Sequence, residues 1–204
     1  MQTKKDTIHQ NVLAVAREEF FEKGYKDTNM RTIARKAGVG LGNIYNYFKN
    51  KDELFNHVLE PAITTLLKLT EDHNSNANLN IAIFESQEYI TKKNNEFLKV
   101  LLEFREEMRI LFFKAHGSSL ENFKEQYIEK NTETSLEFLR LLKERNPDIN
   151  IDISYFFVHA VSSWWVSVMG ELVMHDLKRS ELECFISEYI EYITAGWKKI
   201  MRVE

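Results

Sequence analysis

The chain has 204 residues, a formal net charge of −4 at pH 7, and a hydrophobic share of 44%. That is enough apolar material for a packed core, in one domain or in two small ones. It holds only seven glycines and two prolines, which favours few breaks and long helices. Because no alternating apolar pattern persists, we expect an all-α fold with about nine helices.

Cys184 is the only cysteine, which excludes an intramolecular disulfide and a cysteine metal cluster. A reducing cytoplasm suits such a chain. The first ten residues are polar and lack the apolar segment of a signal peptide, which also favours a cytoplasmic protein. The six histidines show no metal-ligand spacing, so we expect neither a bound metal nor a cofactor.

One apolar run requires comparison with a membrane span. Between Asp152 and Glu171 the sequence has no Asp, Glu, Lys or Arg, and this length borders on that of a spanning helix. The run also contains one histidine and several serines, and no basic cluster flanks it. We therefore expect a buried helix of a soluble protein.

Three short helices are predicted near the start of the chain. The first runs from about Thr7 to Lys23, where apolar residues recur at helical spacing, and Gly24 ends it. Thr28 or Asn29 caps the second helix, and the third begins near Leu41. Together they make residues 1–49 a three-helix unit.

The second and third of these helices form a helix-turn-helix. Ala34 is small enough for the next helix to cross close to it, and Gly38 tolerates the positive φ of the turn. Ile44 then fills the angle between the two helices. Residues 28–51 contain no acidic residue, although the whole chain is acidic. The basic residues of this window are Arg31, Arg35, Lys36, Lys49 and Lys51. Such a local basic window is what a polyanion such as DNA needs.

The same stretch resembles the TetR family of bacterial transcription regulators. The matching residues are Gly24, Tyr25, Thr28, Ile33, Ala34, Ala37, Gly38, Val39, Gly42, Ile44, Tyr45, Tyr47, Phe48, Lys51 and Leu54. One departure is Gly40, where the family usually has a small hydroxyl residue that caps the recognition helix. The resemblance implies a helix-turn-helix DNA-binding domain at 1–49 and a helical ligand-binding and dimerisation domain at 50–204.

Phosphates and bases require different side chains from such a domain. By resemblance to the family, phosphate contacts are assigned to Thr28, Tyr47 and Lys51, and a close approach of the backbone to DNA is assigned to Gly42. Base-edge contacts are assigned to the residues that face away from the core side of the third helix, namely Leu41, Asn43 and Asn46. Arg31 can reach a guanine, and Tyr45 can serve either a phosphate or a base edge.

The rest of the sequence predicts longer helices. Three capping boxes are expected, formed by Asn50 with Glu53, Ser118 with Glu121, and Ser180 with Glu183. The first box opens a helix that contains Pro61, and a polar loop follows at 72–80. Caps, apolar spacing and breaks then predict helices at about 79–93, 95–115, 118–145, 151–177 and 180–201.

The last two predicted helices carry more apolar residues than one buried face requires. A stripe of small residues at helical spacing would permit close approach of another helix, and it consists of Ala160, Ser163, Ser167 and Gly170. The apolar residues of the last helix include Ile186, Ile190, Ile193 and Trp197. TetR-family members dimerise through their last two helices, so the resemblance implies a homodimer. The alternative is that this apolar surface packs within one subunit.

In the TetR family a pocket among the middle helices binds an inducer, which then moves the DNA-binding heads. The resemblance therefore implies a small inducer, and the aromatic residues here suit an apolar or aromatic one. The candidate lining residues are Phe97, Phe104, Phe112, Tyr127, Phe138, Phe156, Trp164 and Trp165. Each of these residues taken singly is more often part of a core.

We thus predict a transcriptional repressor that binds a palindromic DNA operator as a homodimer and is released by such a ligand. One alternative is a DNA-binding regulator without an inducer, controlled by a protein partner or acting as an activator. Another is a helical interaction module that does not bind DNA. An enzyme is not expected, because the sequence has no nucleotide-binding glycine loop and no recognisable nucleophile, base and acid set.

Overall fold

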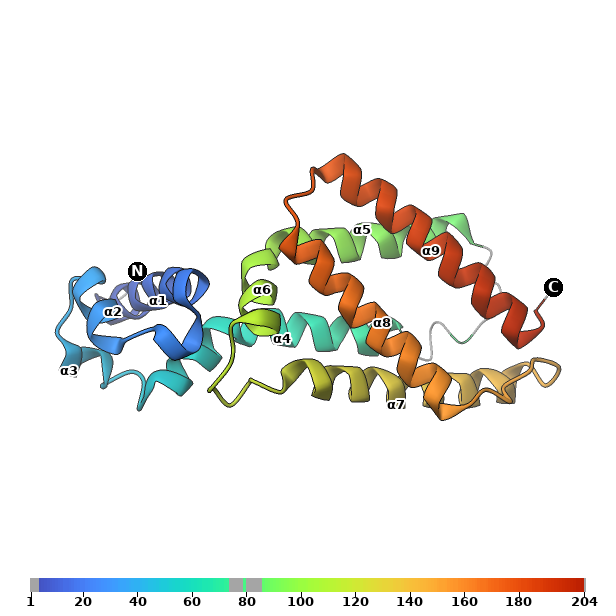
Figure 1. The fold of residues 1–204 in the computed structure, drawn as a ribbon, viewed down its shortest axis with the longest axis horizontal. Helices are drawn as coiled ribbons and strands as arrows, with labels where there is room; N and C mark the ends of the chain where they lie inside the picture. The colour runs from blue at the N-terminus through green and yellow to red at the C-terminus, as the bar shows by residue number, and fades with distance from the viewer. Residues whose placement is uncertain (1–3, 74–78, 80–85, 204) are drawn as a thin grey trace. The chain divides into compact units, whose positions relative to one another are not determined.

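The structure is a computed structural model that describes residues 4–73, 79 and 86–203. All regular elements in these residues are α-helices (Figure 1), which confirms the predicted all-α fold. In chain order the helices are α1 Lys4–Asp27, α2 Met30–Lys36, α3 Leu41–Ile44, α4 Lys51–His73, α5 Gln87–Glu103, α6 Arg105–Phe113, α7 Phe123–Arg145, α8 Tyr155–Met174 and α9 Arg179–Met201.

The contacts divide the chain into two compact units. Unit 1 consists of Met1–Thr64 and Phe104–Lys124, and unit 2 of Thr65–Glu103 and Glu125–Glu204. Unit 1 thus contains the expected DNA-binding segment 1–49 together with the start of α4 and with α6. Both of these elements fall within the predicted C-terminal domain, 50–204.

The helix-turn-helix forms as predicted. Asn29 is the cap of α2, because its Oδ1 accepts a hydrogen bond from the N–H of Arg31 at 2.8 Å. Gly38 has a φ of +67°, the left-handed conformation that the turn requires. α3 begins at Leu41 and is a single turn whose N-cap, Gly40, offers no side chain to its amides. Ile44 is fully buried between the helices.

The end of α1 is held by the segment that follows α6. Gly24 breaks the helical path with a φ of +76°, and a Cβ there would lie 3.2 Å from the carbonyl oxygen of Lys114. The N–H of Tyr25 donates to this same carbonyl at 2.8 Å. The Lys114 ammonium in turn donates to the carbonyl of Phe21. Only glycine combines this conformation with so close a backbone approach.

Two groups of ion pairs fix α1 within unit 1. The buried carboxylate of Glu19 lies 2.8 Å from Lys23 Nζ and 2.5 Å from Lys36 Nζ. Burial opposes ionisation of Glu19, but these two lysines hold its pKa below the ordinary value. Arg17 pairs with the buried Glu107 of α6 and with Glu106 at 2.9 Å. These pairs join α1 to α2 and to α6. Unit 1 therefore includes α6 as well as the three N-terminal helices.

The sequence predicted two helices, at 79–93 and 95–115, and the position of the break between them is wrong. α5 runs through the expected break, because Leu98 and Leu101 are buried and their packing outweighs the weak helix propensity of Asn94 and Asn95. The break comes instead at Phe104, whose ψ of 22° departs from the helical value. The start of the 79–93 prediction and most of the expected loop at 72–80 lie outside the described residues.

Two of the predicted capping boxes are also wrong. Ser118 Oγ accepts from the N–H of Leu120 at 3.1 Å, and Glu121 accepts from the N–H of Gly117 at 2.9 Å. These bonds close a turn, so α7 starts only at Phe123. At α9, Glu181 rather than Glu183 accepts a backbone bond, from the N–H of Lys178 at 2.7 Å.

Two further helix starts, those of α4 and α8, are capped near their predicted positions. Asn50 accepts the expected bond from the N–H of Glu53 at 2.8 Å, although the Glu53 carboxylate returns to the N–H of Lys49. Ser154 caps α8 by accepting from the N–H of Phe157 at 3.2 Å. The predicted ends at 151 and 177 are therefore too wide for this helix, which spans Tyr155–Met174.

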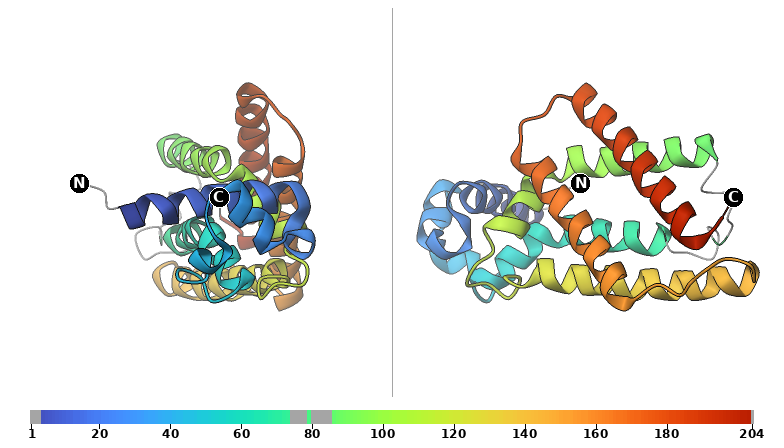
Figure 2. Two further views of the ribbon diagram at one scale, coloured as in Figure 1. Left: turned by 90° about the vertical axis from the view of Figure 1, so that its left-hand side faces the viewer. Right: turned by 45° about the vertical axis from the view of Figure 1, so that its right-hand side comes forward.

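In unit 2, α8 and α9 run in roughly opposite directions, as Figure 1 and the right view of Figure 2 show, and α9 packs against α5. One core cluster consists of Leu79, Phe138, Leu139, Leu142, Ile149, Val158 and Met201. Asn150 joins the segment between α7 and α8 to the end of α9, because its N–H donates to the carbonyl of Met201 at 2.8 Å. α8 is long and apolar enough to cross a membrane, yet 44% of its most apolar stretch is buried in the structure. A helix in the core of a soluble protein has the same composition.

Replacing Arg17 tests the junction of α1 with α6. Arg17→Ala leaves the buried Glu107 carboxylate without this partner, so we expect a loss of about 1–3 kcal/mol in the free energy of unfolding. Urea denaturation followed by circular dichroism measures this loss. Arg179→Ala is the control, because its pair with Glu183 is exposed and contributes about 0.5 kcal/mol or less. Equal stabilities of the two variants would contradict the proposed role of Arg17.

Candidate nucleic-acid interface and internal cavity

α3 and the turn that follows it have an exposed side opposite their buried side. Ile44 and Phe48 are buried in unit 1, whereas Tyr45 is 48% exposed. The other predicted base-contacting residues are exposed or half-buried, namely Leu41 and Asn43 on α3 and Asn46 just after it. Arg31 at the start of α2 is also exposed. The fold therefore leaves these side chains accessible on the surface of unit 1.

The five basic residues of the window have different environments. Arg31, Arg35 and Lys49 are exposed. Lys36 is bound to the buried Glu19 carboxylate at 2.5 Å. Lys36 is itself exposed, but this pair neutralises its charge locally.

Lys51 is used inside unit 1. Its Nζ donates to the carbonyl oxygens of Tyr25 at 2.7 Å, Thr28 at 3.0 Å and Lys26 at 3.3 Å. The ammonium also lies 4.2 Å from the centre of the Tyr25 ring. Burial lowers the pKa of Lys51. An ammonium has three N–H donors, so a phosphate would have to share or replace one of these partners.

Thr28 has a similar internal role. It is 4% exposed, and its Oγ1 lies 2.7 Å from the carbonyl oxygen of Gly24 and 3.1 Å from that of Glu19. The hydroxyl thus joins the end of α1 to the start of α2. The phosphate contacts assigned to Thr28 and Lys51 stay predictions, to which the structure adds this positioning role.

The other two residues assigned to the DNA backbone lie closer to the surface. Tyr47 is half-buried, with its ring 5.7 Å from that of His9 and 6.4 Å from that of Phe48. Gly42 is exposed, and a Cβ built on it would meet nothing within 4 Å. Nothing in the fold itself therefore requires glycine at position 42.

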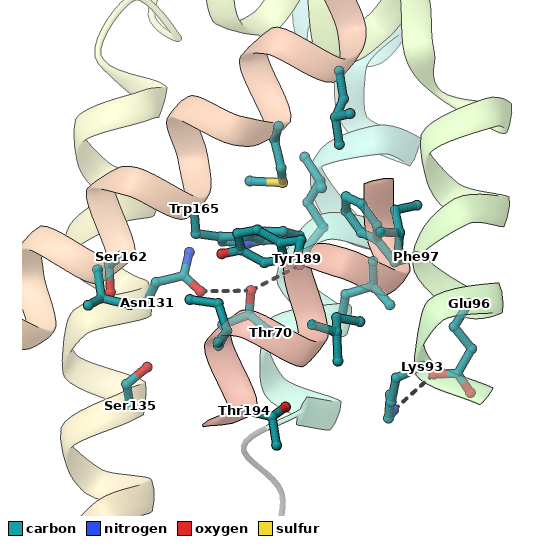
Figure 3. Close-up of a pocket in the computed structure, with 18 of the residues that line it drawn as sticks. Thr70, Lys93, Glu96, Phe97, Asn131, Ser135, Ser162, Trp165, Tyr189 and Thr194 are labelled. Atoms are coloured by element: carbon teal, nitrogen blue, oxygen red, sulfur yellow. Dashed lines mark hydrogen bonds and ion pairs between the residues drawn. The ribbon is translucent and has the colours of Figure 1, made fainter. Parts of the chain in front are cut away.

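Unit 2 contains a cavity of about 310 Å³ that is partly open to solvent (Figure 3). Its wall includes an aromatic group from three helices. The ring of Trp165 on α8 lies 4.8 Å from Phe97 on α5 and 5.3 Å from Tyr189 on α9, and Phe185 lies 6.1 Å from Tyr189. Burial strongly raises the pKa of Tyr189, so this phenol stays neutral at physiological pH.

A hydrogen-bonded group forms another part of the cavity wall. Thr70 Oγ1 lies 2.9 Å from the hydroxyl of Tyr127 and donates to Asn131 Oδ1 at 3.2 Å (Figure 3). These residues come from α4 and α7 and are buried. The charged residues among the described lining are Lys93 and Glu96, which pair at 2.9 Å.

The predicted pocket residues lie in different places. Phe97, Tyr127 and Trp165 line the cavity. The other five do not: Phe104 and Phe112 belong to unit 1, Phe138 to the core cluster of unit 2, and Phe156 and Trp164 are 75% and 41% exposed. Aromatic content identified residue types that suit a pocket but did not specify which helix face each residue occupies.

The predicted dimer residues are divided between two surfaces. On α9, Ile186, Ile190, Ile193 and Trp197 line the cavity. On α8, Ala160 and Ser167 are exposed, Ser163 is half-buried and Gly170 is buried. The exposed large apolar side chains of these two helices are Tyr155, Phe156, Phe157, Trp164, Met174 and Tyr192. We call this exposed set, with Ala160 and Ser167, the α8/α9 surface.

Residues 12–58 match the family model described as bacterial regulatory proteins of the tetR family. Over these residues, 12–58, the chain belongs to the TetR family. The chain is 47% identical over 57 residues to the uncharacterized HTH-type transcriptional regulator YhgD of Bacillus subtilis (strain 168). This alignment covers 28% of each chain, so the similarity to YhgD spans much less than its whole length.

Solved structures share the fold of most of the chain. MexZ of Pseudomonas aeruginosa, a repressor, gives a TM-score of 0.66 at 21% identity, with 93% of this chain and 94% of MexZ covered. NalD of the same organism, the secondary repressor of the MexAB-OprM multidrug efflux pump, gives 0.62 at 20% identity, with 91% and 94% covered. At this identity the likeness establishes the fold alone.

Sequence reasoning missed two features of this chain. The first is the buried Glu19, although it falls three residues after Ala16 on the apolar face of α1 and this spacing could have indicated it. The second is the lining of the cavity by α9, through residues such as Tyr189 and Phe185. The apolar residues on several faces of α9 were visible in the sequence, but they were interpreted as a dimer surface, with packing within one subunit as the alternative.

Replacing Lys51 tests its positioning role in unit 1 in the absence of DNA. Lys51→Met removes the donor to two carbonyls at the end of α1 and to that of Thr28 just after it, so we expect a loss of about 1–3 kcal/mol in the free energy of unfolding. Lys49→Met is the matched control, because Lys49 is exposed, and its effect should stay within about 0.5 kcal/mol. Chemical denaturation followed by circular dichroism gives both values. An unchanged stability of the Lys51 variant would rule out the positioning role.

Proposed function

We propose that the protein is a transcriptional repressor that binds a palindromic operator as a homodimer and is released by a small, largely apolar or aromatic ligand. In this proposal residues 1–49 bind DNA, and residues 50–204 dimerise and bind the ligand. The observation that carries the proposal is the helix-turn-helix, whose polar side is exposed within the segment that matches the TetR family.

The chemistry of the exposed residues suits the major groove of DNA. An asparagine amide such as that of Asn43 or Asn46 can pair with adenine, and Leu41 can contact the methyl group of thymine. Arg31 can pair with guanine through two hydrogen bonds. Arg35 and Lys49 supply charge for phosphates without sequence preference. Because Gly42 lies in open space, the DNA backbone can approach the chain closely there.

A homodimer is supported by the α8/α9 surface. Phe156, Trp164 and Tyr192 are 75%, 41% and 68% exposed, which is a large apolar area for a surface in water. The small residues Ala160 and Ser167 between them leave room for a helix of a second copy. Two copies around a two-fold axis place their recognition helices at half-sites about one helical turn apart, 10–10.5 base pairs.

Repression and release by a ligand have separate support. MexZ and NalD, which share the fold, are both named repressors. The cavity of about 310 Å³ lies within the range of small-molecule sites and has aromatic walls. A regulator without an inducer remains the alternative function, and it would show no ligand that alters DNA binding.

The DNA-binding proposal is tested by gel shift and footprinting on DNA that flanks the gene, with random DNA as competitor and at several salt concentrations. Arg31→Ala should weaken operator binding by about 1–3 kcal/mol and relax the preference at one base pair. Lys49→Ala should weaken operator and random DNA alike, with a smaller salt dependence. Equal losses on both DNAs for Arg31→Ala would contradict its role in base contact.

The dimer is tested by a charge placed in the α8/α9 surface. Ser167→Arg should give a monomer, because a buried guanidinium without a partner is costly at an apolar interface. Sedimentation velocity measures the oligomeric state, and the palindromic footprint should weaken together with the dimer. Ser187→Arg, on an exposed part of α9 outside the α8/α9 surface, is the control. A stable Ser167→Arg dimer would place the interface elsewhere.

A further inference from the structure

A histidine of α1 packs beside the residues that follow the recognition helix. The ring of His9 lies 5.7 Å from that of Tyr47 and is stacked at 5.2 Å on that of Phe48. Slightly later on α1, Asn11 Nδ2 donates to the carbonyl of Ala37 at the end of α2 at 2.8 Å. This part of α1 is therefore fixed against the end of α2 and against the residues after α3.

The imidazole of His9 is held by packing rather than by polar partners. Its side chain is half-buried, and with the other described residues it has ring contacts but neither a hydrogen bond nor an ion pair. Phe48, which is 1% exposed, fixes one face of the ring. An imidazole of this kind keeps its nitrogens available to water or to a ligand, and when it is protonated both nitrogens are donors.

Tyr47 relates His9 to the DNA. Under the proposed function the Tyr47 hydroxyl contacts a phosphate, and its half-buried ring is the one beside His9. The exposed Lys49 follows shortly after in the chain. A charge on His9 would thus lie next to a phosphate contact, where the field of the DNA favours a cation.

The acidic residues of α1 leave such a charge largely uncompensated. Asp6, one turn before His9, is exposed. The next acidic residue is Glu18, which at 1.5 Å per residue lies about 13 Å further along the helix. Exposed charges this far apart are mostly screened, because the Debye length is about 8 Å at physiological ionic strength. Carboxylates ordinarily titrate well below pH 6, so they contribute no change of charge between pH 6 and pH 8.

On the other face of Phe48 lies a second histidine, His57 of α4, with its ring 5.3 Å from that of Phe48. Its Nδ1 donates to the carbonyl of Glu53 at 2.9 Å. The Glu53 carboxylate accepts from the N–H of Lys49, so it is engaged at the start of α4. Phe48 separates the two imidazoles. His57 is therefore a matched control for His9, because it contacts the same ring from another helix.

Histidine is the side chain whose charge ordinarily changes between about pH 5 and 8. We infer that His9 is a further DNA-binding residue, whose protonated ring supplies a cation for the DNA backbone beside Tyr47 and makes DNA binding stronger as the pH falls. This inference rests on the proposed function, because it adds a residue and a pH dependence to the same DNA-binding surface. The effect is independent of base sequence, since phosphates carry no sequence information.

DNA affinities at two pH values test the inference. Fluorescence anisotropy of a labelled operator and of a labelled random duplex measures them with the full chain, at pH 8 and pH 6 and constant ionic strength. The wild type should bind both DNAs about tenfold more tightly at pH 6, as expected for one charge-assisted hydrogen bond. The salt dependence should also be steeper at pH 6, by about one phosphate contact. Equal affinities at the two pH values would overturn the inference.

Three variants identify the titrating group. His9→Phe keeps a ring against Tyr47 and Phe48 but carries no charge, so it should bind DNA no more tightly at pH 6 than at pH 8. His9→Lys is charged at both pH values and should bind at pH 8 about as tightly as the wild type binds at pH 6. His57→Phe should keep the wild-type pH dependence. Circular dichroism checks the folding of each variant. If His9→Phe keeps the pH dependence, or His57→Phe loses it, His9 is only a packing residue.

The same measurements separate this inference from the proposed function. If an operator is protected and His9→Phe retains the wild-type pH profile, the repressor proposal stands and the inference fails. If random DNA shows the expected pH dependence but no operator is preferred, the role of His9 stands and the sequence-specific repressor fails. If neither DNA is bound at either pH, the proposed function fails.

Discussion

The carbonyl groups at the C-terminal end of α1 are the constraint on which unit 1 depends. A helix end leaves carbonyls that its own backbone cannot satisfy. In this chain the ammonium groups of Lys51 and Lys114 satisfy them, one from the start of α4 and one from the segment after α6. Three parts of the chain that are distant in sequence therefore meet at one helix end. The helix-turn-helix follows directly after this junction, so its position depends on it.

The sequence predicted the local features of this unit and not the distant ones. The cap at Asn29, the turn at Gly38 and the buried Ile44 depend on neighbours within a few residues, and all three were found as expected. The partners of Lys51 lie on α1 and in the turn after it, so its charge alone suggested a surface cation. The pairing of Arg17 with Glu107 spans ninety positions and leaves no local pattern.

The cavity and the α8/α9 surface have one origin in the sequence. α8 is apolar around its whole circumference, so one face can line a cavity while another stays on the surface. Periodicity gives the number of apolar faces but not what covers each of them. This is why Trp165 lines the cavity, whereas its neighbour Trp164, predicted to do the same, is exposed. On α9, likewise, Phe185, Tyr189 and Trp197 line the cavity, whereas Tyr192 is exposed.

The three tryptophans of the chain, Trp164, Trp165 and Trp197, all belong to unit 2. Trp165 and Trp197 line the cavity, and the ring of Tyr189 lies 5.3 Å from both Trp164 and Trp165. Indole emission therefore reports on the cavity and its surroundings, and events confined to the helix-turn-helix are silent in it. Far-ultraviolet dichroism sees the helices of both units. Following both signals in one thermal unfolding experiment would show whether units 1 and 2 unfold in one cooperative transition or in two.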